Sequence, residues 1–246
     1  MTDAQFHALP DGLRLAYRHT PPATADRPTL VFLSGYMSDM QGSKALATYD
    51  WAKDQGLGCL CLDYSGCGRS DGEFAQGSLS RWRDDTLALI EALTQGPLVL
   101  VGSSMGGWIM LLVALAIPQR VQAMVGIAAA PDFTQWGFPD DAKALLSSGL
   151  THFRPNPYGP EPTPTYAKFW ADGQNVRLLE APIDLTCPVR LLHGMEDDVV
   201  PPQISQRLMA ILRSDDVQTI LVKAGDHRLS RESDIALLLT TIGSLV

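Results

Sequence analysis

The sequence has little cysteine and no cysteine motif typical of a disulfide framework or a metal site. Its four cysteines are Cys59, Cys61, Cys67 and Cys187, without a CxxC pair or a Cys/His ligand spacing. Cys59 and Cys61 lie two residues apart in an apolar stretch, which favours buried thiols on one strand over a bridge. We therefore expect free thiols, a reducing compartment and no metal centre.

Long hydrophobic runs and an excess of positive charge are also absent. The longest unbroken apolar run, residues 108–117, is too short to span a bilayer. The net charge is -8, so nothing basic attracts nucleic acid or an anionic membrane. The first residues, MTDAQFHALPDG, have neither the basic patch nor the apolar run of a signal peptide. These absences predict a soluble, cytoplasmic protein with no nucleic-acid partner and no membrane span.

Residues 97–108 read PLVLVGSSMGGW and combine a buried strand, a glycine-rich turn and the start of an apolar helix. A G-x-S-x-G motif between a strand and a helix is typical of a nucleophile elbow, here centred on Ser104. Gly102 and Gly106 leave room for the tight turn, and the helix N-terminus favours negative charge developing at the serine. The alternative is a Gly/Ser turn between two core elements, which the flanking strand and helix make less favoured.

Strand and helix patterns alternate along most of the chain, which predicts one α/β domain with a parallel sheet covered on both faces. Strand patterns occupy residues 13–18, 29–33, 98–101, 123–127, 189–194 and 219–222, with another inside 56–62; helical patterns occupy 44–53, 79–93, 108–117, 202–212 and 232–245. Residues 133–183 interrupt this alternation with a proline-rich, aromatic segment. We interpret this segment, called the cap below, as an insertion in a single domain of residues 1–246.

A second glycine-rich loop follows the strand inside residues 56–62. Its Gly66-Cys67-Gly68 segment suggests a dinucleotide site at first sight, but no third glycine follows at the required offset and no helix starts there. The segment therefore predicts a turn, and we expect no cofactor.

A serine nucleophile needs a base and an acid that orients it, in the chain order serine, acid, histidine for this type of elbow. The histidines after Ser104 are His152 in the cap, His193 at the end of a strand and His227 in the loop after the last strand. We expect His227 to be the base and His193 to be structural, the alternative for His227 being a surface histidine near a helix start.

The orienting acid should lie in the loop after residues 189–194, which offers Glu196, Asp197 and Asp198. At least two of these carboxylates must be solvated loop charges. Spacing alone does not choose between Asp197 and Asp198.

Acyl transfer also needs donors for the oxyanion. The backbone N–H of Met105, directly after the nucleophile, supplies one. The loop after residues 29–33 should supply the other from Tyr36, with Gly35 letting that loop approach Ser104. The Tyr36 side chain would have a separate role if it is a packed aromatic.

Three motifs make the chain resemble the α/β-hydrolases. They are Gly102-x-Ser104-x-Gly106, Asp63-Tyr64-Ser65-Gly66-x-Gly68-x-Ser70, and His193-Gly194-x-x-Asp197-x-x-Val200-Pro201. The resemblance implies a mostly parallel eight-stranded sheet with helices on both faces and a small cap. It also implies that Asp197, four residues after the histidine of the last motif, is the catalytic acid.

Within that family, DYSGCGRSDG, VGSSMGGW, RLLHGMEDDVVP and DHR resemble mitochondrial members that remove palmitoyl groups from protein cysteines and cleave acyl-glucuronides. The chain shows no transit peptide, which points to a bacterial, cytoplasmic relative; a mature organellar form would lie in the mitochondrial matrix. The cap has no motif in common with those members.

These observations predict a serine hydrolase (esterase or thioesterase) that acts on small-molecule or acyl-protein substrates, with Ser104, Asp197 and His227 as its triad. A carbon–carbon bond hydrolase with the same triad and a non-catalytic ligand-binding module are the alternatives. We expect Trp108 and Trp136 to bind substrate. The other cap aromatics either line the acyl pocket or pack the cap; they are Phe133, Phe138, Phe153, Tyr158, Tyr166, Phe169 and Trp170. The sequence does not predict the oligomeric state.

Overall fold

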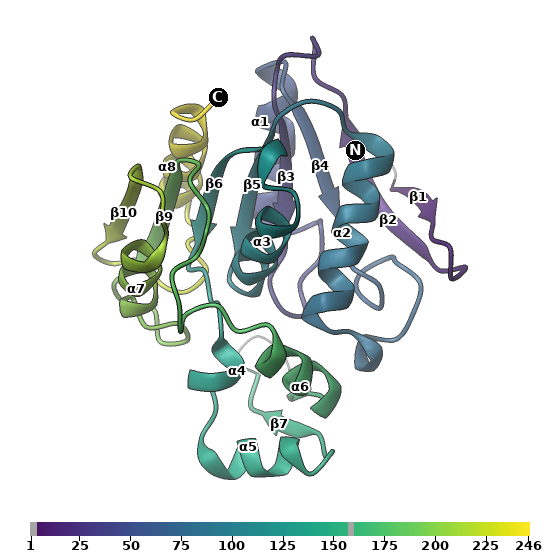
Figure 1. Ribbon diagram of the computed structural model, residues 1–246, viewed down its shortest axis with the longest axis vertical. Helices are drawn as coiled ribbons and strands as arrows, with labels where there is room; N and C mark the ends of the chain where they lie inside the picture. The colour runs from purple at the N-terminus through teal and green to yellow at the C-terminus, as the bar shows by residue number, and fades with distance from the viewer. Residues whose placement is uncertain (1–3, 157–159) are drawn as a thin grey trace.

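An eight-stranded sheet runs through the computed structural model, which describes residues 4–156 and 160–246 (Figure 1). Its strands, in spatial order, are β1 (Gln5–Ala8), β2 (Arg14–Thr20), β4 (Gly58–Leu62), β3 (Thr29–Leu33), β5 (Leu98–Ser103), β6 (Val121–Ile127), β9 (Val189–Gly194) and β10 (Val217–Val222). From β4 to β10 all neighbours are parallel, while β2 runs antiparallel to both β1 and β4. The mostly parallel eight-stranded sheet predicted from the sequence is confirmed.

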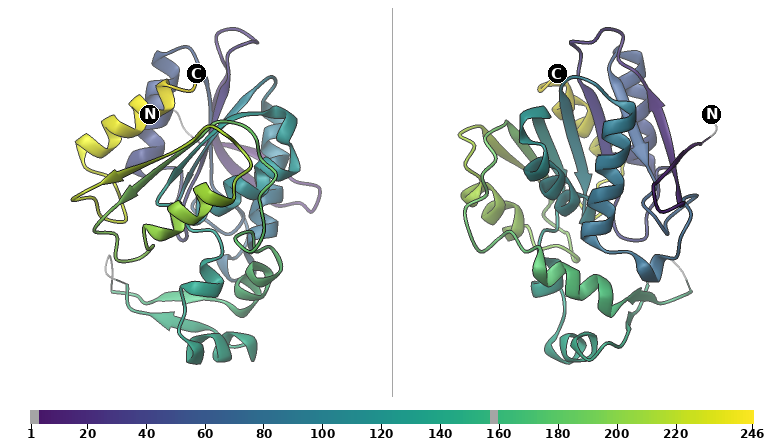
Figure 2. Two further views of the ribbon diagram at one scale, coloured as in Figure 1. Left: turned by 60° about the vertical axis from the view of Figure 1, so that its left-hand side comes forward. Right: turned by 45° about the vertical axis from the view of Figure 1, so that its right-hand side comes forward.

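Helices cover both faces of the sheet, as predicted (Figure 2). One face packs on α2 (Leu79–Leu93), α3 (Met105–Ala116) and α7 (Gln203–Ile211), and the other on α1 (Ser43–Asp54) and α8 (Glu232–Gly243). Single 3-10 turns lie at Phe74–Gln76 and Pro118–Arg120. The apolar residues of the central strands therefore divide between two separate hydrophobic cores.

Strand β4 illustrates how alternation along one strand feeds both cores. Leu60 and Leu62 belong to the core under α2 and α3, whereas Cys59 and Cys61 belong to the core under α1 and α8. Both cysteines are buried and free, as their spacing predicted. They act as small apolar residues between the sheet and α1.

The cap leaves the sheet after β6 and returns before β9 (Figure 1). It contains α4 (Phe133–Trp136), α5 (Asp140–Ser147), β7 (His152–Arg154), β8 (Thr163–Thr165) and α6 (Ala167–Asn175), with β7 and β8 paired antiparallel. At its base the carboxylate of Asp132 accepts the backbone N–H groups of Leu178 and Leu179, both at 2.8 Å. This clamp joins the two chain segments through which the cap connects to the sheet.

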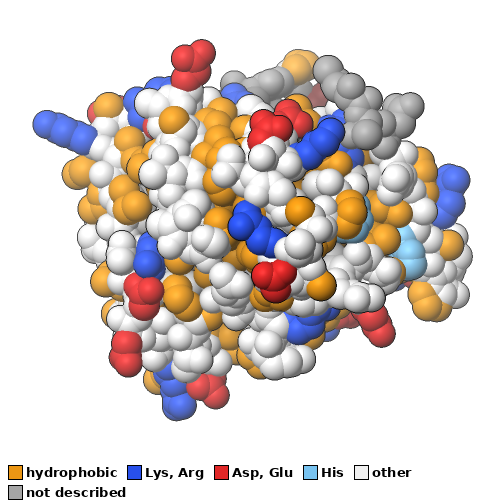
Figure 3. Space-filling view, turned by 90° about the horizontal axis from the view of Figure 1, so that it is seen from above, with side chains coloured by type: hydrophobic (Ala, Val, Ile, Leu, Met, Phe, Trp, Pro, Cys, Tyr) orange, Lys and Arg blue, Asp and Glu red, His pale blue; other side chains and the backbone are white. Residues whose placement is uncertain are grey.

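Figure 3 views the end of the molecule opposite the cap. Acidic and basic side chains are interspersed over this face, without a patch of one charge sign. None of the helices in the described parts of the chain combines the length and apolar character needed to cross a bilayer.

Candidate active site

Ser104 lies at the sharp turn between β5 and α3, with a φ of 55° and a ψ of -120°. A positive φ is strained for a residue with a side chain. The turn holds this conformation because Gly102 and Gly106 pack closely: a Cβ on Gly102 would lie 2.5 Å from the Gly106 carbonyl oxygen, and one on Gly106 would overlap the Leu33 carbonyl. The glycines therefore serve the tight turn, as the sequence predicted.

The structure brings Ser104 together with His227 and Asp197, which come from the loops after β10 and β9. The distance from Ser104 Oγ to His227 Nε2 is 3.1 Å, and that from His227 Nδ1 to Asp197 Oδ2 is 2.9 Å. A carboxylate only accepts, so Nδ1 carries the proton and Nε2 is free to accept from the serine hydroxyl. Asp198, the other acid left open by spacing, is exposed to solvent.

The carboxylate of Asp197 is fully buried and accepts hydrogen bonds on both oxygens. Oδ1 receives the backbone N–H groups of Val199 at 2.9 Å and Val200 at 2.8 Å. Burial alone would raise the pKa of Asp197, but hydrogen bonds from His193, His227 and Val200 outweigh it and hold this pKa well below its ordinary value. The acid is therefore kept ionised.

His193 is buried at the end of β9, with both ring nitrogens engaged. Nδ1 lies 2.7 Å from Ser205 Oγ, and Nε2 lies 2.8 Å from the Val200 carbonyl and 3.2 Å from Asp197 Oδ2. Both partners of Nε2 are acceptors, so Nε2 carries the proton. The predicted structural role agrees with these contacts, and the bond to Asp197 is an addition that the sequence did not indicate.

The two predicted oxyanion donors flank Ser104. A Cβ on Gly35 would lie 3.4 Å from both the Ser103 carbonyl oxygen and Ser104 Cβ, so the loop carrying Tyr36 passes directly beside the serine. Neither Tyr36 N–H nor Met105 N–H donates a hydrogen bond to any described part of the chain. Both donors therefore remain available for an oxygen atom next to Ser104.

The loop after β4 holds the Tyr36 loop in place. Asp63 Oδ1 accepts the Met40 backbone N–H at 2.8 Å, and the Tyr64 hydroxyl donates to the Ser34 carbonyl at 3.2 Å. Gly68 has a φ of 51°, and a Cβ there would overlap the Asp63 carboxylate. The Gly66-Cys67-Gly68 segment is thus a turn wrapped around the Asp63 side chain.

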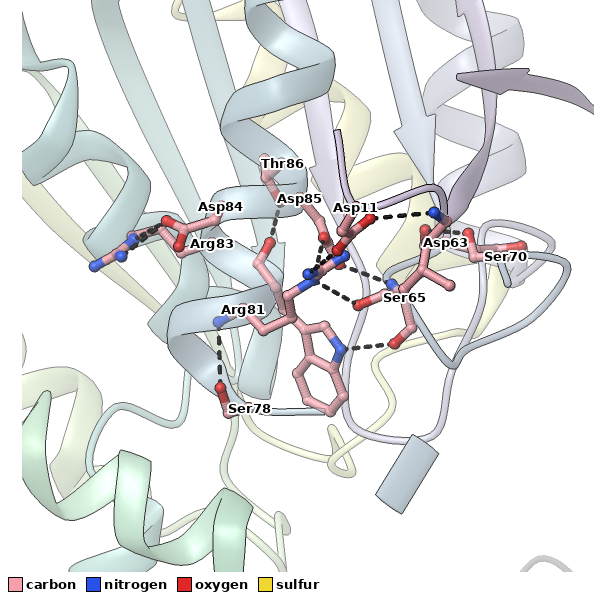
Figure 4. Close-up of polar contacts among 12 residues, drawn as sticks. Asp11, Asp63, Ser65, Ser70, Ser78, Arg81, Arg83, Asp84, Asp85 and Thr86 are labelled. Carbon is pink, nitrogen blue, oxygen red and sulfur yellow. Dashed lines mark hydrogen bonds and ion pairs between the residues drawn. The ribbon is translucent and has the colours of Figure 1, made fainter. Parts of the chain in front are cut away.

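Helix α2 in turn anchors this second loop through a network of polar contacts (Figure 4). Arg81 bonds to Asp85 at 2.8 Å, to Asp11 at 2.6 Å and to Ser65 Oγ at 3.2 Å. The Ser65 backbone donates to Asp85 at 2.8 Å, and the Trp82 indole donates to the Ser65 carbonyl at 3.0 Å. A chain of contacts therefore runs from α2 to the loop that carries Tyr36.

A cavity of about 380 Å³, including its open mouth, lies beside Ser104. It is lined by Tyr36, Ser104, Met105, Ala130, Phe133, Trp136, Gly137, Arg154, Val199 and Val200. Trp136 was expected there. Val199 and Val200 were not predicted, although they lie two and three residues after Asp197 on the same loop.

The expectation that Trp108 contacts substrate is wrong for this structure. Trp108 is completely buried, its ring packs against Phe133 at 5.8 Å between centroids, and its indole N–H donates to the Val176 carbonyl at 3.1 Å. The residue lies in α3 on the side that faces the core, so it supports the cavity wall from behind.

The other cap aromatics divide between packing and solvent. Phe138 and Phe169 are buried, and Phe169 packs on Tyr36 with 4.9 Å between ring centroids. Phe153 is 60% exposed, and Tyr158 lies outside the described residues. Only Phe133 and Trp136 among the described cap aromatics line the cavity.

No group of three or more His, Cys, Asp or Glu side chains within residues 4–156 and 160–246 is arranged to hold a metal ion. The candidate site is thus composed of a serine, a histidine, a buried carboxylate and two backbone donors. Such groups can carry out nucleophilic acyl transfer.

Comparison with known proteins gives relatives over the whole chain. The chain is 39% identical to human mitochondrial palmitoyl-protein thioesterase ABHD10 in an alignment of 249 residues that covers 100% of this chain and 80% of the relative. The structure of mouse alpha/beta hydrolase domain-containing protein 10 is 38% identical, with a TM-score of 0.90, covering 99% of this chain and 98% of that one. A putative hydrolase from Agrobacterium vitis S4 is also 38% identical, with a TM-score of 0.93 and 100% of both chains covered.

The model of the alpha/beta hydrolase family matches residues 30–237. This range begins in β3 and ends in α8, so it contains the serine turn, the loops with Asp197 and His227, and the cap. The chain therefore belongs to the alpha/beta hydrolase family.

Proposed function

We propose that this protein hydrolyses carboxylic esters or thioesters through an acyl-serine intermediate, with Ser104 as nucleophile, His227 as base and Asp197 as the orienting acid. The observation that carries the proposal is the unbroken hydrogen-bond chain from Ser104 Oγ through the His227 ring to Asp197 Oδ2, at 3.1 and 2.9 Å. A serine hydroxyl with a free imidazole nitrogen in reach is the arrangement that makes it nucleophilic.

In the acylation half of the reaction, Ser104 Oγ attacks the carbonyl carbon while its proton moves to His227 Nε2. The carbonyl oxygen becomes an oxyanion and accepts the N–H groups of Met105 and Tyr36. The bond to the leaving oxygen or sulfur then breaks, and the proton on Nε2 passes to that atom. The products are an acyl-Ser104 ester and a free alcohol or thiol.

In the deacylation half, a water molecule repeats the attack. Its oxygen adds to the acyl carbon while one proton moves to His227 Nε2, and the oxyanion again forms beside the two N–H groups. Cleavage of the bond to Ser104 Oγ returns that proton to the serine and releases a carboxylic acid. Asp197 remains ionised throughout and stabilises the imidazolium that forms twice per turnover.

Thioesters are included because of the relatives. The name of the human relative describes it both as a palmitoyl-protein thioesterase and as mitochondrial. We therefore extend the proposal to acyl-protein thioesters and, of the two locations considered from the sequence, favour the mitochondrial matrix.

The test compares the wild-type protein with Ser104→Ala and Ser103→Ala on 4-nitrophenyl butyrate. We expect Ser104→Ala to lose at least about a thousandfold in kcat and all labelling by a fluorophosphonate probe. Ser103 is the neighbouring serine at the end of β5. Ser103→Ala should retain both the wild-type kcat and labelling by the probe. Probe adduct on Ser103, or equal turnover by wild type and Ser104→Ala, would reject the proposal.

A further inference from the structure

Arg154 is a basic side chain in the wall of the Ser104 cavity. It ends cap strand β7, is half-buried, and lines the cavity together with Tyr36, Phe133 and Trp136. Two other arginines with largely covered side chains are paired, since Arg190 bonds to Asp216 at 2.8 Å and Arg81 to Asp85 at the same distance. The buried Arg18 pairs with no carboxylate among the described residues, but it does not line the cavity. In the described parts of the chain, no carboxylate pairs with Arg154.

The surroundings of Arg154 make an unpaired positive charge on its guanidinium energetically unfavourable. Burial lowers the pKa of Arg154, and the Tyr36 hydroxyl is the one group that acts against this shift. Phe133, Trp136 and Val200 supply apolar walls to the same cavity. A desolvated guanidinium forms strong bidentate bonds with a carboxylate, so an anionic group that enters this cavity has a ready partner.

The position of His227 indicates which half of a substrate enters the cavity. His227 delivers its proton to the leaving alcohol or thiol, so the leaving group lies on the side of the imidazole. The cavity is lined by Ser104 and both oxyanion donors but not by His227. The acyl half therefore occupies the cavity, and Arg154 faces the acyl half.

We propose that Arg154 is a specificity residue that binds a carboxylate at the far end of the acyl group, so that half-esters or half-thioesters of dicarboxylic acids are preferred substrates. This inference rests on the proposed hydrolase function. The apolar walls contact the methylene chain between the two carbonyl carbons, and Arg154 neutralises the terminal charge. A neutral acyl chain of the same length fills the same walls but leaves the guanidinium unpaired.

The test uses two esters that differ only at the end of the acyl chain, 4-nitrophenyl hexanoate and mono-4-nitrophenyl adipate. The measured quantity is the ratio of kcat/KM for the adipate ester to kcat/KM for the hexanoate ester, after subtraction of turnover by Ser104→Ala. We expect this ratio to exceed 1 in the wild type, to fall about tenfold or more in Arg154→Met, and to fall less in Arg154→Lys, which keeps the charge but not the bidentate geometry.

Lys143 gives a matched control, because it is a cap cation on α5 that pairs with Asp140 and does not line the cavity. Lys143→Met should keep the wild-type ratio. A second arm moves the carboxylate to the leaving group, in the hexanoyl ester of 4-hydroxybenzoate. The wild-type and Arg154→Met proteins should differ much less on this ester than on the adipate ester.

The outcomes separate this inference from the hydrolase function. If hexanoate turnover depends on Ser104 but the ratio is the same in wild type and Arg154→Met, the carboxylate site is rejected and the hydrolase remains. If Arg154→Met affects only the 4-hydroxybenzoate ester, the assignment of the anion to the acyl half is wrong. If no ester is turned over above the Ser104→Ala background, both proposals fail together.

Discussion

His193 and Asp197 are joined at one oxygen: Nε2 of His193 lies 3.2 Å from Asp197 Oδ2, the same atom that accepts Nδ1–H of His227 at 2.9 Å. The other oxygen of Asp197 is held by two backbone N–H groups. The carboxylate is therefore fixed in its plane by groups outside the Ser104–His227 pair. In the proposed mechanism, His193 is therefore expected to be a positioning residue that acts through Asp197.

Replacing His193 with Phe should raise the pKa of Asp197 towards its ordinary value, because one N–H donor to the carboxylate is lost. We expect kcat/KM to fall about tenfold, the effect of losing one hydrogen bond to a charged group. The Asp197 carboxyl can be followed by carbon NMR as pH is lowered. Ser205→Ala is the control, since it removes the partner of Nδ1 and leaves Nε2–H in place. An unchanged Asp197 titration in His193→Phe would contradict this role.

Asp197→Asn should lower kcat by several orders of magnitude, because an amide can hold the imidazole in the wrong tautomer and lacks the charge that stabilises the imidazolium. Asp198→Asn changes an exposed carboxylate one residue away and should cost at most about tenfold. Steady-state kinetics on one nitrophenyl ester measures both. The reverse ranking of the two variants would remove Asp197 from the mechanism.

The dependence of kcat/KM on the length of the acyl chain tests whether Trp136 forms an apolar wall of the cavity. Each buried methylene contributes about 0.8 kcal/mol, so kcat/KM should rise about fourfold per carbon from acetyl to hexanoyl 4-nitrophenyl esters. Trp136→Ala should flatten this rise, because an apolar wall of the cavity is removed. Phe153→Ala removes a cap aromatic that is 60% exposed and should keep the wild-type slope. A steady decline from acetyl onward in the wild type would refute an apolar acyl site.

The lowered pKa of Lys44 predicts that the free energy of unfolding changes with pH under alkaline conditions. Its ammonium donates to the Arg228 carbonyl and to Ser230 Oγ, next to His227, and burial lowers the pKa of Lys44 from 10.5 to about 8, with the charge of Arg228 adding to the effect. Between these two values the unfolded chain binds more protons than the folded protein. The free energy of unfolding should therefore rise with pH from 8 to 10.5.

The measurement compares urea unfolding of the wild type and Lys44→Met across that pH range. The wild type should gain stability relative to the variant as pH rises, since only the wild type has this proton to lose. Lys53→Met, at an exposed position in the same helix, should follow the wild type. Parallel pH curves for wild type and Lys44→Met would show that Lys44 does not have the lowered pKa.

The sequence was most informative about the candidate active site, because chemistry and chain order restrict which residues can occupy it. A tight turn needs Gly102 and Gly106 around Ser104, and the order serine, acid, histidine left few candidates for the groups that the structure places beside it. Strand β1 was missed because its four residues are mostly exposed and form no apolar run. Strands β7 and β8 were missed because three residues in a proline-rich segment leave no periodicity to read.

The side-chain environment of the cavity depends on contacts between distant segments, which local patterns do not reveal. Trp108 is one turn beyond Ser104, and its direction towards the core follows from the packing of α3 against the cap. Arg154 ends β7, which pairs with β8, and this arrangement of the cap brings it into the cavity wall together with Tyr36. The signal in the sequence was a basic residue directly after Phe153 in the proline-rich part of the cap.

The Tyr36 hydroxyl donates to the Pro164 carbonyl of β8 at 2.9 Å, while the backbone of the same residue carries one of the two free N–H groups beside Ser104. Tyr36 thus connects the cap, through its side chain, with the proposed oxyanion site, through its backbone. A cap displaced from the sheet would leave the half-buried Tyr36 hydroxyl without this acceptor and would remove one of the contacts that hold the Tyr36 loop. In the proposed mechanism, a substrate bulky enough to displace the cap would therefore also disturb the Tyr36 N–H as an oxyanion donor, and the enzyme would discriminate against it by a slower reaction as well as by weaker binding.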